Sequence, residues 1–247
     1  MLSRDQIDFY QENGYILLEG LFTPKEAAAY RQRGHDLIDG LAARKSVEAT
    51  WDSARELVKE VKLLHCHDVQ FYDAAFNKLL FDPRLVDSAA ELMGTPNIQL
   101  HHNKMFIKPP EKGAPFPMHQ DQPFFPHEKH TMTAAIIHFD DAPVEKGCVR
   151  VVPGSYKLGP LQHIESGGWH LPFSEYPLES SIPCAAKAGD VLVFNYLTIH
   201  GSGVNVSDEP RTTLLIQMRD PSDHPLTDVH RSPGQGTMLR GINTDEV

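Results

Sequence analysis

The amino-acid sequence predicts a mostly β protein, a double-stranded β-helix (a cupin-like jelly roll) flanked by N-terminal α-helices. Three observations support this fold class. Helix signals crowd the first 94 residues. After them, short apolar or alternating runs are each closed by proline or glycine. Few helix-length segments separate those runs, which favours an antiparallel sheet that closes into a barrel.

Capping signals locate the helices of the N-terminal part. Ser3 can cap a first helix, and Thr23-Pro24-Lys25-Glu26 combines a capping box with proline at the first helical position. Gly94 stops a later helix that begins near Pro83. The expected helices cover residues 3–14, 24–40, 52–64 and 83–93, and YILLEGLF (residues 15–22) is expected to be a short strand.

Turn residues delimit the strands of the barrel. The runs NIQLHHNKMFIKPP, GCVRVVPGS and RTTLLIQMRDP each end in a turn signal. The expected strands lie within residues 97–110, 131–143, 147–155, 189–203 and 211–221. The chain is therefore expected to form one domain over residues 1–247, with a mainly helical part (1–94), a jelly-roll core (95–220) and a polar C-terminal tail (221–247).

Composition excludes several classes of protein. Asp and Glu number 33 against 23 Lys and Arg, and no basic patch is available for phosphates, so nucleic acid is not expected as a partner. The start of the chain lacks a secretory pattern, and no apolar run approaches a membrane span, so a soluble cytoplasmic protein is expected. Cys66, Cys148 and Cys184 have no CxxC spacing and are expected to be reduced. The oligomeric state is left open.

The stretch PFPMHQDQPFFP (residues 115–126) carries a candidate metal site. Residues two apart in a strand share a face, so His119 and Asp121 can both reach one point inside the barrel. A histidine and a carboxylate are two of the ligands of the two-His-one-carboxylate triad that binds ferrous iron. The best third ligand is His200, where the apolar run GDVLVFNYLTIH ends beside Gly201-Ser202-Gly203.

Arg211 follows His200 by eleven residues. If the strands around residues 200 and 211 form a hairpin, these two side chains lie opposite one another on one face. Guanidinium binds a carboxylate through two charge-assisted hydrogen bonds. Arg211 can therefore hold the far end of a dicarboxylate whose near end chelates the metal, a description that fits 2-oxoglutarate.

The order of NGYILLEGLF, MHQD, KGCVRVVPGSY, GDVLVFNYLTIHGSG and EPRTTLLIQ resembles the phytanoyl-CoA dioxygenase family of iron- and 2-oxoglutarate-dependent oxygenases over nearly the whole chain. The family motif of H-x-D, a distant H and a later R is matched by His119, Asp121, His200 and Arg211. The resemblance implies Fe(II) as cofactor and 2-oxoglutarate and O2 as cosubstrates.

The resemblance also implies a hydroxyl group two residues after the distal histidine that contacts 2-oxoglutarate, and Ser202 occupies that place. Further cosubstrate contacts are expected on the strand before H-x-D, which offers His102 and Lys104 on one face and His101 and Asn103 on the other. Of these four residues, Lys104 is the one expected to contact 2-oxoglutarate. Asp121 stands where related halogenases carry a small residue, which favours hydroxylation or another oxidative outcome over halogenation.

Other interpretations of single residues stay open. His138 and Asp140 repeat the H-x-D spacing, but they are expected to be strand-end and turn residues. His65 and His67 are not followed by a second pair at zinc-like spacing. Arg211 can instead pair with the nearby Asp208 or Glu209. Phe124, Phe125 and Trp169 are equally consistent with packing and with a substrate wall.

The leading hypothesis is an enzyme, a dioxygenase that hydroxylates an unactivated C–H bond of a small-molecule metabolite and releases succinate and CO2 from 2-oxoglutarate. The acidic net charge favours a polar or cationic substrate, although overall charge says little about one pocket. The alternatives are a metal-binding jelly roll without oxygenase activity, such as a sensor or an isomerase, and a structural sandwich that needs no metal.

Overall fold

A computed structural model describes residues 1–43, 64–110, 115–166, 168–228 and 231–245. Its α-helices are α1 (Arg4–Asn13), α2 (Pro24–Ala43), α4 (Ala74–Leu80) and α5 (Pro83–Met93). Its strands are β1 (Tyr15–Leu18), β2 (Leu64–His67), β3 (Ile98–Lys108), β4 (Phe116–His119), β5 (Thr133–His138), β6 (Val149–Val151), β7 (Ile182–Pro183), β8 (Val191–Asn195), β9 (His200–Ser202), β10 (Arg211–Arg219) and β11 (Met238–Arg240).

The capping signals lie where they were expected. Ser3 Oγ accepts a hydrogen bond from the backbone N–H of Gln6, whose side chain accepts one from the N–H of Ser3. Gly14 ends α1 in the left-handed region, at φ 74°. Asp82 caps α5 and Gly94 ends it. The helix expected over residues 52–64 lies outside the described residues except for Leu64, which begins β2.

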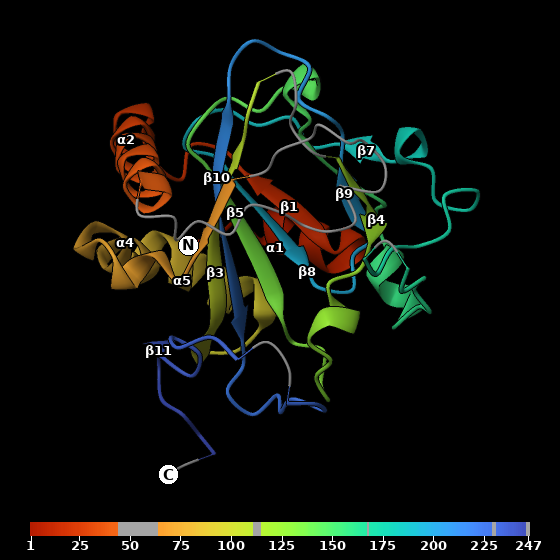
Figure 1. Cartoon of the computed structure of the whole chain (residues 1–247). Coiled ribbons are helices and arrows are strands. Elements are labelled where there is room, and N and C mark those ends of the chain that lie inside the picture. The colour runs from red at the N-terminus through yellow and green to blue at the C-terminus, as the bar shows by residue number, and fades with distance from the viewer. Residues whose placement is uncertain (44–63, 111–114, 167, 229–230, 246–247) are drawn as a thin grey trace.

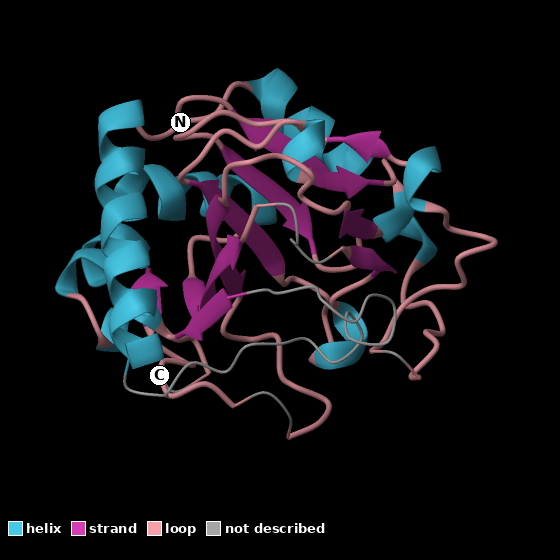
Figure 2. Ribbon diagram, turned by 45° about the horizontal axis from the view of Figure 1, so that its top comes forward, coloured by secondary structure: helices cyan, strands magenta, loops and turns pink. Residues whose placement is uncertain are grey.

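The strands form two antiparallel sheets, as a jelly roll requires (Figure 1). The larger sheet has the order β1-β8-β5-β10-β3-β11, with β2 also paired to β3, and the smaller has the order β4-β9-β6-β7. Helices α2, α4 and α5 lie along one side of the larger sheet, which Figure 2 shows from a second direction. The other face of that sheet looks toward the smaller sheet.

Strand alternation divides the side chains of the larger sheet between these two faces. Ile137, Leu214 and Ile216 belong to the core cluster that includes the helix residues Phe76 and Leu85. Their sequence neighbours point the other way, into the space between the sheets. On β10 the residues on this inner face are Arg211, Thr213, Leu215 and Gln217, all of which line one cavity.

The run GDVLVFNYLTIHGSG was expected to be one strand, and this expectation is wrong. The chain turns after Asn195, whose side-chain oxygen and backbone carbonyl accept the N–H groups of Leu197 and Thr198. The part before the turn is β8 of the larger sheet, and the part after it is β9 of the smaller sheet. His200 therefore begins a strand instead of ending one.

The expected hairpin between His200 and Arg211 is also wrong. β9 pairs with β4 and β6, whereas β10 pairs with β3 and β5, so the two residues lie in different sheets. They still meet, because the two sheets face each other across the cavity that both residues line.

Several elements of the described chain were not expected, namely the strands β2, β7 and β11 and the short helix α4. The C-terminal segment adds β11 to the edge of β3, where Arg240 Nε donates to Asp87 Oδ1 of α5 at 2.7 Å. None of the helices in the described ranges is long and apolar enough to cross a membrane.

Candidate active site

His119, Asp121 and His200 form the candidate metal site, and their ligand atoms all lie within 4.8 Å of one another. Nε2 of each histidine lies 3.6 Å from Asp121 Oδ1. Asp121 was expected to lie in the same strand as His119, but β4 ends at His119. Asp121 itself has helical backbone angles, φ −73° and ψ −22°. The N–H of Asp121 donates to Tyr196 O at 2.9 Å, which ties this residue to the turn after β8.

Backbone carbonyl groups orient both imidazole rings. His119 Nδ1 lies 2.7 Å from Pro117 O, and His200 Nδ1 lies 2.9 Å from Thr198 O. A carbonyl oxygen only accepts hydrogen bonds, so each Nδ1 carries the hydrogen and each Nε2 keeps its lone pair for a metal. Burial and the neighbouring His119 lower the pKa of His200 to about 4, which keeps this ring neutral.

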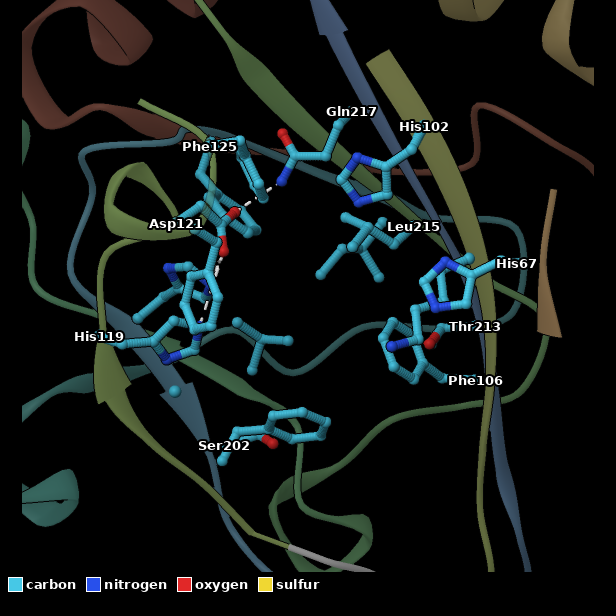
Figure 3. Close-up of a pocket in the computed structure, with 18 of the residues that line it drawn as sticks. His67, His102, Phe106, His119, Asp121, Phe125, Ser202, Thr213, Leu215 and Gln217 are labelled. Carbon is cyan, nitrogen blue, oxygen red and sulfur yellow. Dashed lines mark hydrogen bonds and ion pairs between the residues drawn. The ribbon is translucent and has the colours of Figure 1, made fainter. Parts of the chain in front are cut away.

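Gln217 orients the carboxylate of Asp121. Gln217 Nε2 donates to Asp121 Oδ2 at 2.6 Å, which leaves Oδ1 directed toward the histidines (Figure 3). Burial alone raises the pKa of the Asp121 carboxyl, but His200, His119 and Gln217 reverse the shift and lower that pKa to about 2. Sequence reasoning missed Gln217, although it lies on the same face of β10 as Arg211.

A second group of polar residues lies at the closed end of the cavity. Arg211 is 5% exposed, and its Nη1 donates to the backbone carbonyl of Gly147. Gly147 has φ 65°, and a Cβ there would collide with the backbone of Gly203, so this turn requires glycine. Ser202, the hydroxyl residue expected to contact 2-oxoglutarate, is also buried and lines the same cavity as Arg211.

Lys108 is the residue that sequence reasoning missed at this end. It lies opposite Arg211 in the register of β3 and β10 and is 0% exposed. Its Nζ donates to Ser202 Oγ at 2.8 Å and to Gly203 O at 2.7 Å. Burial, followed by the charge of Arg211, lowers the pKa of Lys108 well below its usual value. We call Arg211, Lys108 and Ser202 the buried basic end.

Charges at the buried basic end lack a carboxylate partner among the described residues. Glu209, which was one alternative partner of Arg211, pairs with Lys146 instead. The buried Nε of Arg211 has no hydrogen-bond partner in the described part of the chain. Burying a cation without a counter-ion is costly, so this end is suited to an anion.

One cavity of about 160 Å³ contains both groups, since the triad, Arg211 and Ser202 all line it. Lys104 lines it as well, but it pairs with Leu215 in the register, four residues along β3 from Lys108. Four residues of extended strand span about 13 Å. The register therefore favours Lys108 over Lys104 at the buried basic end, and the cosubstrate contact assigned to Lys104 stays a prediction.

The remaining candidate residues have other places. His138 is the buried last residue of β5, and Asp140 pairs with Arg31 and accepts the N–H of Thr212, so this H-x-D copy has structural partners. Phe124 and Phe125 line the cavity. Trp169 packs against Phe124, with the ring centroids 6.5 Å apart.

Comparison with known proteins agrees with this geometry. Residues 10–213 match the family model described as phytanoyl-CoA dioxygenase. A probable alpha-ketoglutarate-dependent hypophosphite dioxygenase of Stutzerimonas stutzeri is 29% identical over 84% of this chain and 75% of its own length. The ectoine dioxygenase of Bordetella bronchiseptica is 25% identical over 87% of this chain and 74% of its own length.

Among solved structures, the epimerase SnoN in complex with Fe3+, alpha ketoglutarate and nogalamycin RO has the same fold. It superposes with a TM-score of 0.77 at 22% identity over 97% of this chain and 96% of its own. The expected jelly-roll fold is thereby confirmed. Because the family model spans most of the sequence, the chain belongs to the phytanoyl-CoA dioxygenase family of iron- and 2-oxoglutarate-dependent oxygenases.

Proposed function

We propose that this enzyme hydroxylates an unactivated C–H bond of a small-molecule metabolite, with His119, Asp121 and His200 as ligands of Fe(II). The observation that carries the proposal is the presence of two complementary sites in one cavity. One is a set of two imidazoles and one carboxylate with preset orientation. The other is a buried basic end in which a guanidinium N–H has no hydrogen-bond partner among the described residues.

The donor set fits the metal that the family uses. Both histidines present Nε2, and Gln217 restricts Asp121 to one free oxygen. Two imidazoles and one carboxylate leave coordination positions open for a chelating cosubstrate and for O2. Bound iron would supply the activation of O2, and 2-oxoglutarate would supply two electrons and leave as succinate and CO2.

The protein contributes anchoring and exclusion of water. Arg211 and Ser202 would bind the far carboxylate of 2-oxoglutarate, and Lys108 would position the Ser202 hydroxyl and add positive charge. Aromatic side chains on the cavity wall, including Phe124 and Phe125, exclude water from the reacting carbon. Two relatives are named for small substrates, hypophosphite and ectoine, which supports a small-molecule substrate here.

Anaerobic titration tests this proposal. Metal-free protein receives Fe(II) and then 2-oxoglutarate, and the visible metal-to-ligand charge-transfer band is followed in wild type, Asp121→Ala and Arg211→Ala. We expect the band in wild type only, or far weaker in the variants. Iron binding without a band in wild type would instead support the alternative, a metal-binding jelly roll without oxygenase activity.

The reaction outcome has its own test. Succinate release is measured with a panel of candidate metabolites, and the product is analysed by mass spectrometry after incubation under 18O2. Gain of one labelled oxygen atom supports hydroxylation. Loss of two hydrogens without oxygen, or a product of unchanged mass, contradicts it.

A further inference from the structure

Gln120, the middle residue of the H-x-D motif, is a buried cross-link within the protein. Its side chain is 0% exposed and does not line the cavity that contains the metal site. Its Nε2 donates to Leu197 O at 2.8 Å and to Gly159 O at 2.9 Å, and its Oε1 accepts the N–H of Leu161 at 2.8 Å. Both amide hydrogens are therefore donated, and the side chain is held in one orientation.

One of these contacts joins the two segments that carry the metal ligands. Leu197 precedes His200 by three residues, in the turn that follows β8. The N–H of Asp121 donates to the adjacent carbonyl, Tyr196 O, at 2.9 Å. Two consecutive carbonyl groups of the turn thus hold two consecutive residues of the motif. These hydrogen bonds add to the pairing of β4 with β9 and fix the motif relative to the segment that leads into His200.

The imidazole of His163 holds the backbone of Gln120. His163 Nε2 accepts the N–H of Gln120 at 2.8 Å, and His163 Nδ1 lies 2.9 Å from Leu161 O. Because a carbonyl oxygen only accepts hydrogen bonds, Nδ1 carries the hydrogen and the lone pair of Nε2 is the acceptor. The side chain of His163 is buried. The backbone N–H between the two ligands of the motif is therefore held by a buried side chain from another segment.

One connection between β6 and β7 contacts the motif on both sides of its first ligand. Residues 159–163 of this connection bind Gln120, as described above. Farther along, the N–H of Leu171 donates to Met118 O at 2.9 Å. Contacts before and after the first ligand limit the movement of the backbone that carries it. Hydrogen bonds that orient metal ligands contribute strongly to metal affinity.

We propose that Gln120 and His163 are positioning residues for the metal site. They hold His119 and Asp121 at the separation from His200 at which all three side chains can bind one ion. Neither Gln120 nor His163 lines the cavity, so their effect reaches the metal through the backbone of the motif. This inference rests on the proposed function, since it takes the triad to be the ligand set of Fe(II).

Titration of metal-free protein with Fe(II) in the absence of O2 tests the role of His163. His163→Leu removes the acceptor and should weaken Fe(II) binding about tenfold or more, because loss of outer hydrogen-bond partners costs about 10- to 100-fold. His163→Gln places a carbonyl oxygen near the position of Nε2 and should recover most of that affinity. After 2-oxoglutarate is added, the charge-transfer band should shift in His163→Leu and return in His163→Gln. A lower Tm alone would not move the band.

His170→Leu is the matched control. His170 is a buried histidine of the same connection, with Nδ1 2.9 Å from Leu171 O and its ring stacked on Phe173. Its loss should lower the Tm and leave both Fe(II) affinity and the band unchanged. If His163→Leu does not fold, His163→Asn takes its place, because this shorter side chain does not reach the N–H of Gln120.

Gln120→Met keeps the length of the side chain and removes its three hydrogen bonds, so it should also weaken Fe(II) binding about tenfold or more. Wild-type Fe(II) affinity in His163→Leu or Gln120→Met would overturn the inference. Equal losses in His163→Leu and His170→Leu, or no recovery in His163→Gln, would overturn it as well. If the wild type binds no Fe(II), or binds it without a band, the proposed function fails instead.

Discussion

The two lysines of β3 that face between the sheets have opposite surroundings. Lys108 is fully buried, donates to Ser202 Oγ and Gly203 O, and lies opposite Arg211. Lys104, four residues away, is half-buried, lies over Phe106 and is opposite His67 and Leu215. One strand thus places Lys104 on the cavity lining and Lys108 beside Arg211 and Ser202 at the buried basic end. The difference shows that position along the strand decides the surroundings of each lysine.

The metal site is the most constrained part of the cavity. Each histidine is fixed by a carbonyl two residues before it, and Asp121 is fixed by Gln217. A preset donor set costs little reorganisation when the metal binds. Variants at the metal site, at the buried basic end and at His138 of the neighbouring strand β5 can therefore be ranked by the size of the expected effect.

The largest effect is expected at the metal site. Asp121→Ala removes the sole carboxylate of the triad and should weaken Fe(II) binding well over 100-fold, because loss of outer hydrogen-bond partners alone costs about 10- to 100-fold. Anaerobic iron titration measures this. Asp140→Asn alters the other H-x-D copy and should leave iron affinity unchanged; equal losses in both variants would contradict the assignment.

Next comes the buried basic end. Arg211→Ala should raise the KM for 2-oxoglutarate by about 10- to 100-fold, since a hydrogen bond to a charged group contributes about 1.5–3 kcal/mol. Iron affinity should change little. Arg219→Ala is the control, because Arg219 is also a buried arginine of β10 but donates to the carbonyls of Pro221 and Asp223. It should lower stability without raising that KM.

A smaller effect is expected for the residue that orients Asp121. Gln217→Leu keeps the volume but removes the 2.6 Å hydrogen bond, so Fe(II) affinity should fall about tenfold. Gln217→Glu places a like charge beside Asp121, so the pKa of the Asp121 carboxyl should rise and iron binding should be lost at a higher pH. Unchanged iron affinity in Gln217→Leu would show that the carboxylate is oriented by other contacts.

The smallest effect, a change in the pH dependence of stability, is expected at His138 of β5, which is paired with Thr213 of β10. Burial, followed by the charge of Arg211, lowers the pKa of His138 to about 4. The unfolded chain binds this proton near pH 6.5, so the contribution to stability is present above that pH and is lost as pH falls toward 4. Between about pH 7.5 and 5.5 the loss from His138 alone should be about 1 kcal/mol.

Urea unfolding at the two pH values measures this loss. The other buried histidines contribute to the same slope, so His138→Gln is compared with wild type. The variant should lose about 1 kcal/mol less than wild type over the interval. Identical pH dependence in the two proteins would mean that His138 is not held neutral by its surroundings.

Sequence patterns predicted the features that depend on residues close together in the chain or on a motif of fixed spacing. Ser3, Gly14, Pro83 and Gly94 are local signals whose effect depends on a few neighbouring residues, and α1 and α5 begin and end where those signals indicate. The H-x-D motif, His200 and Arg211 likewise line one cavity.

What the sequence could not predict depends on contacts between distant strands. The turn after Asn195 moves β9 into the other sheet, and the only local signal for it is the single asparagine within an apolar run. Gln217 and Lys108 become site residues through the register of β10 with β3 and through the approach of the two sheets. Alternation along RTTLLIQM places Gln217 on the face of Arg211, so that one signal was available.

The most direct test of the central claim compares the two lysines of β3 in one measurement. Lys108→Met and Lys104→Met are loaded with Fe(II) without O2, and the Kd of 2-oxoglutarate is measured from the charge-transfer band. Lys108→Met should raise this Kd about tenfold or more, and should raise it more than Lys104→Met does. A larger loss in Lys104→Met than in Lys108→Met would contradict the assignment of the buried basic end to 2-oxoglutarate.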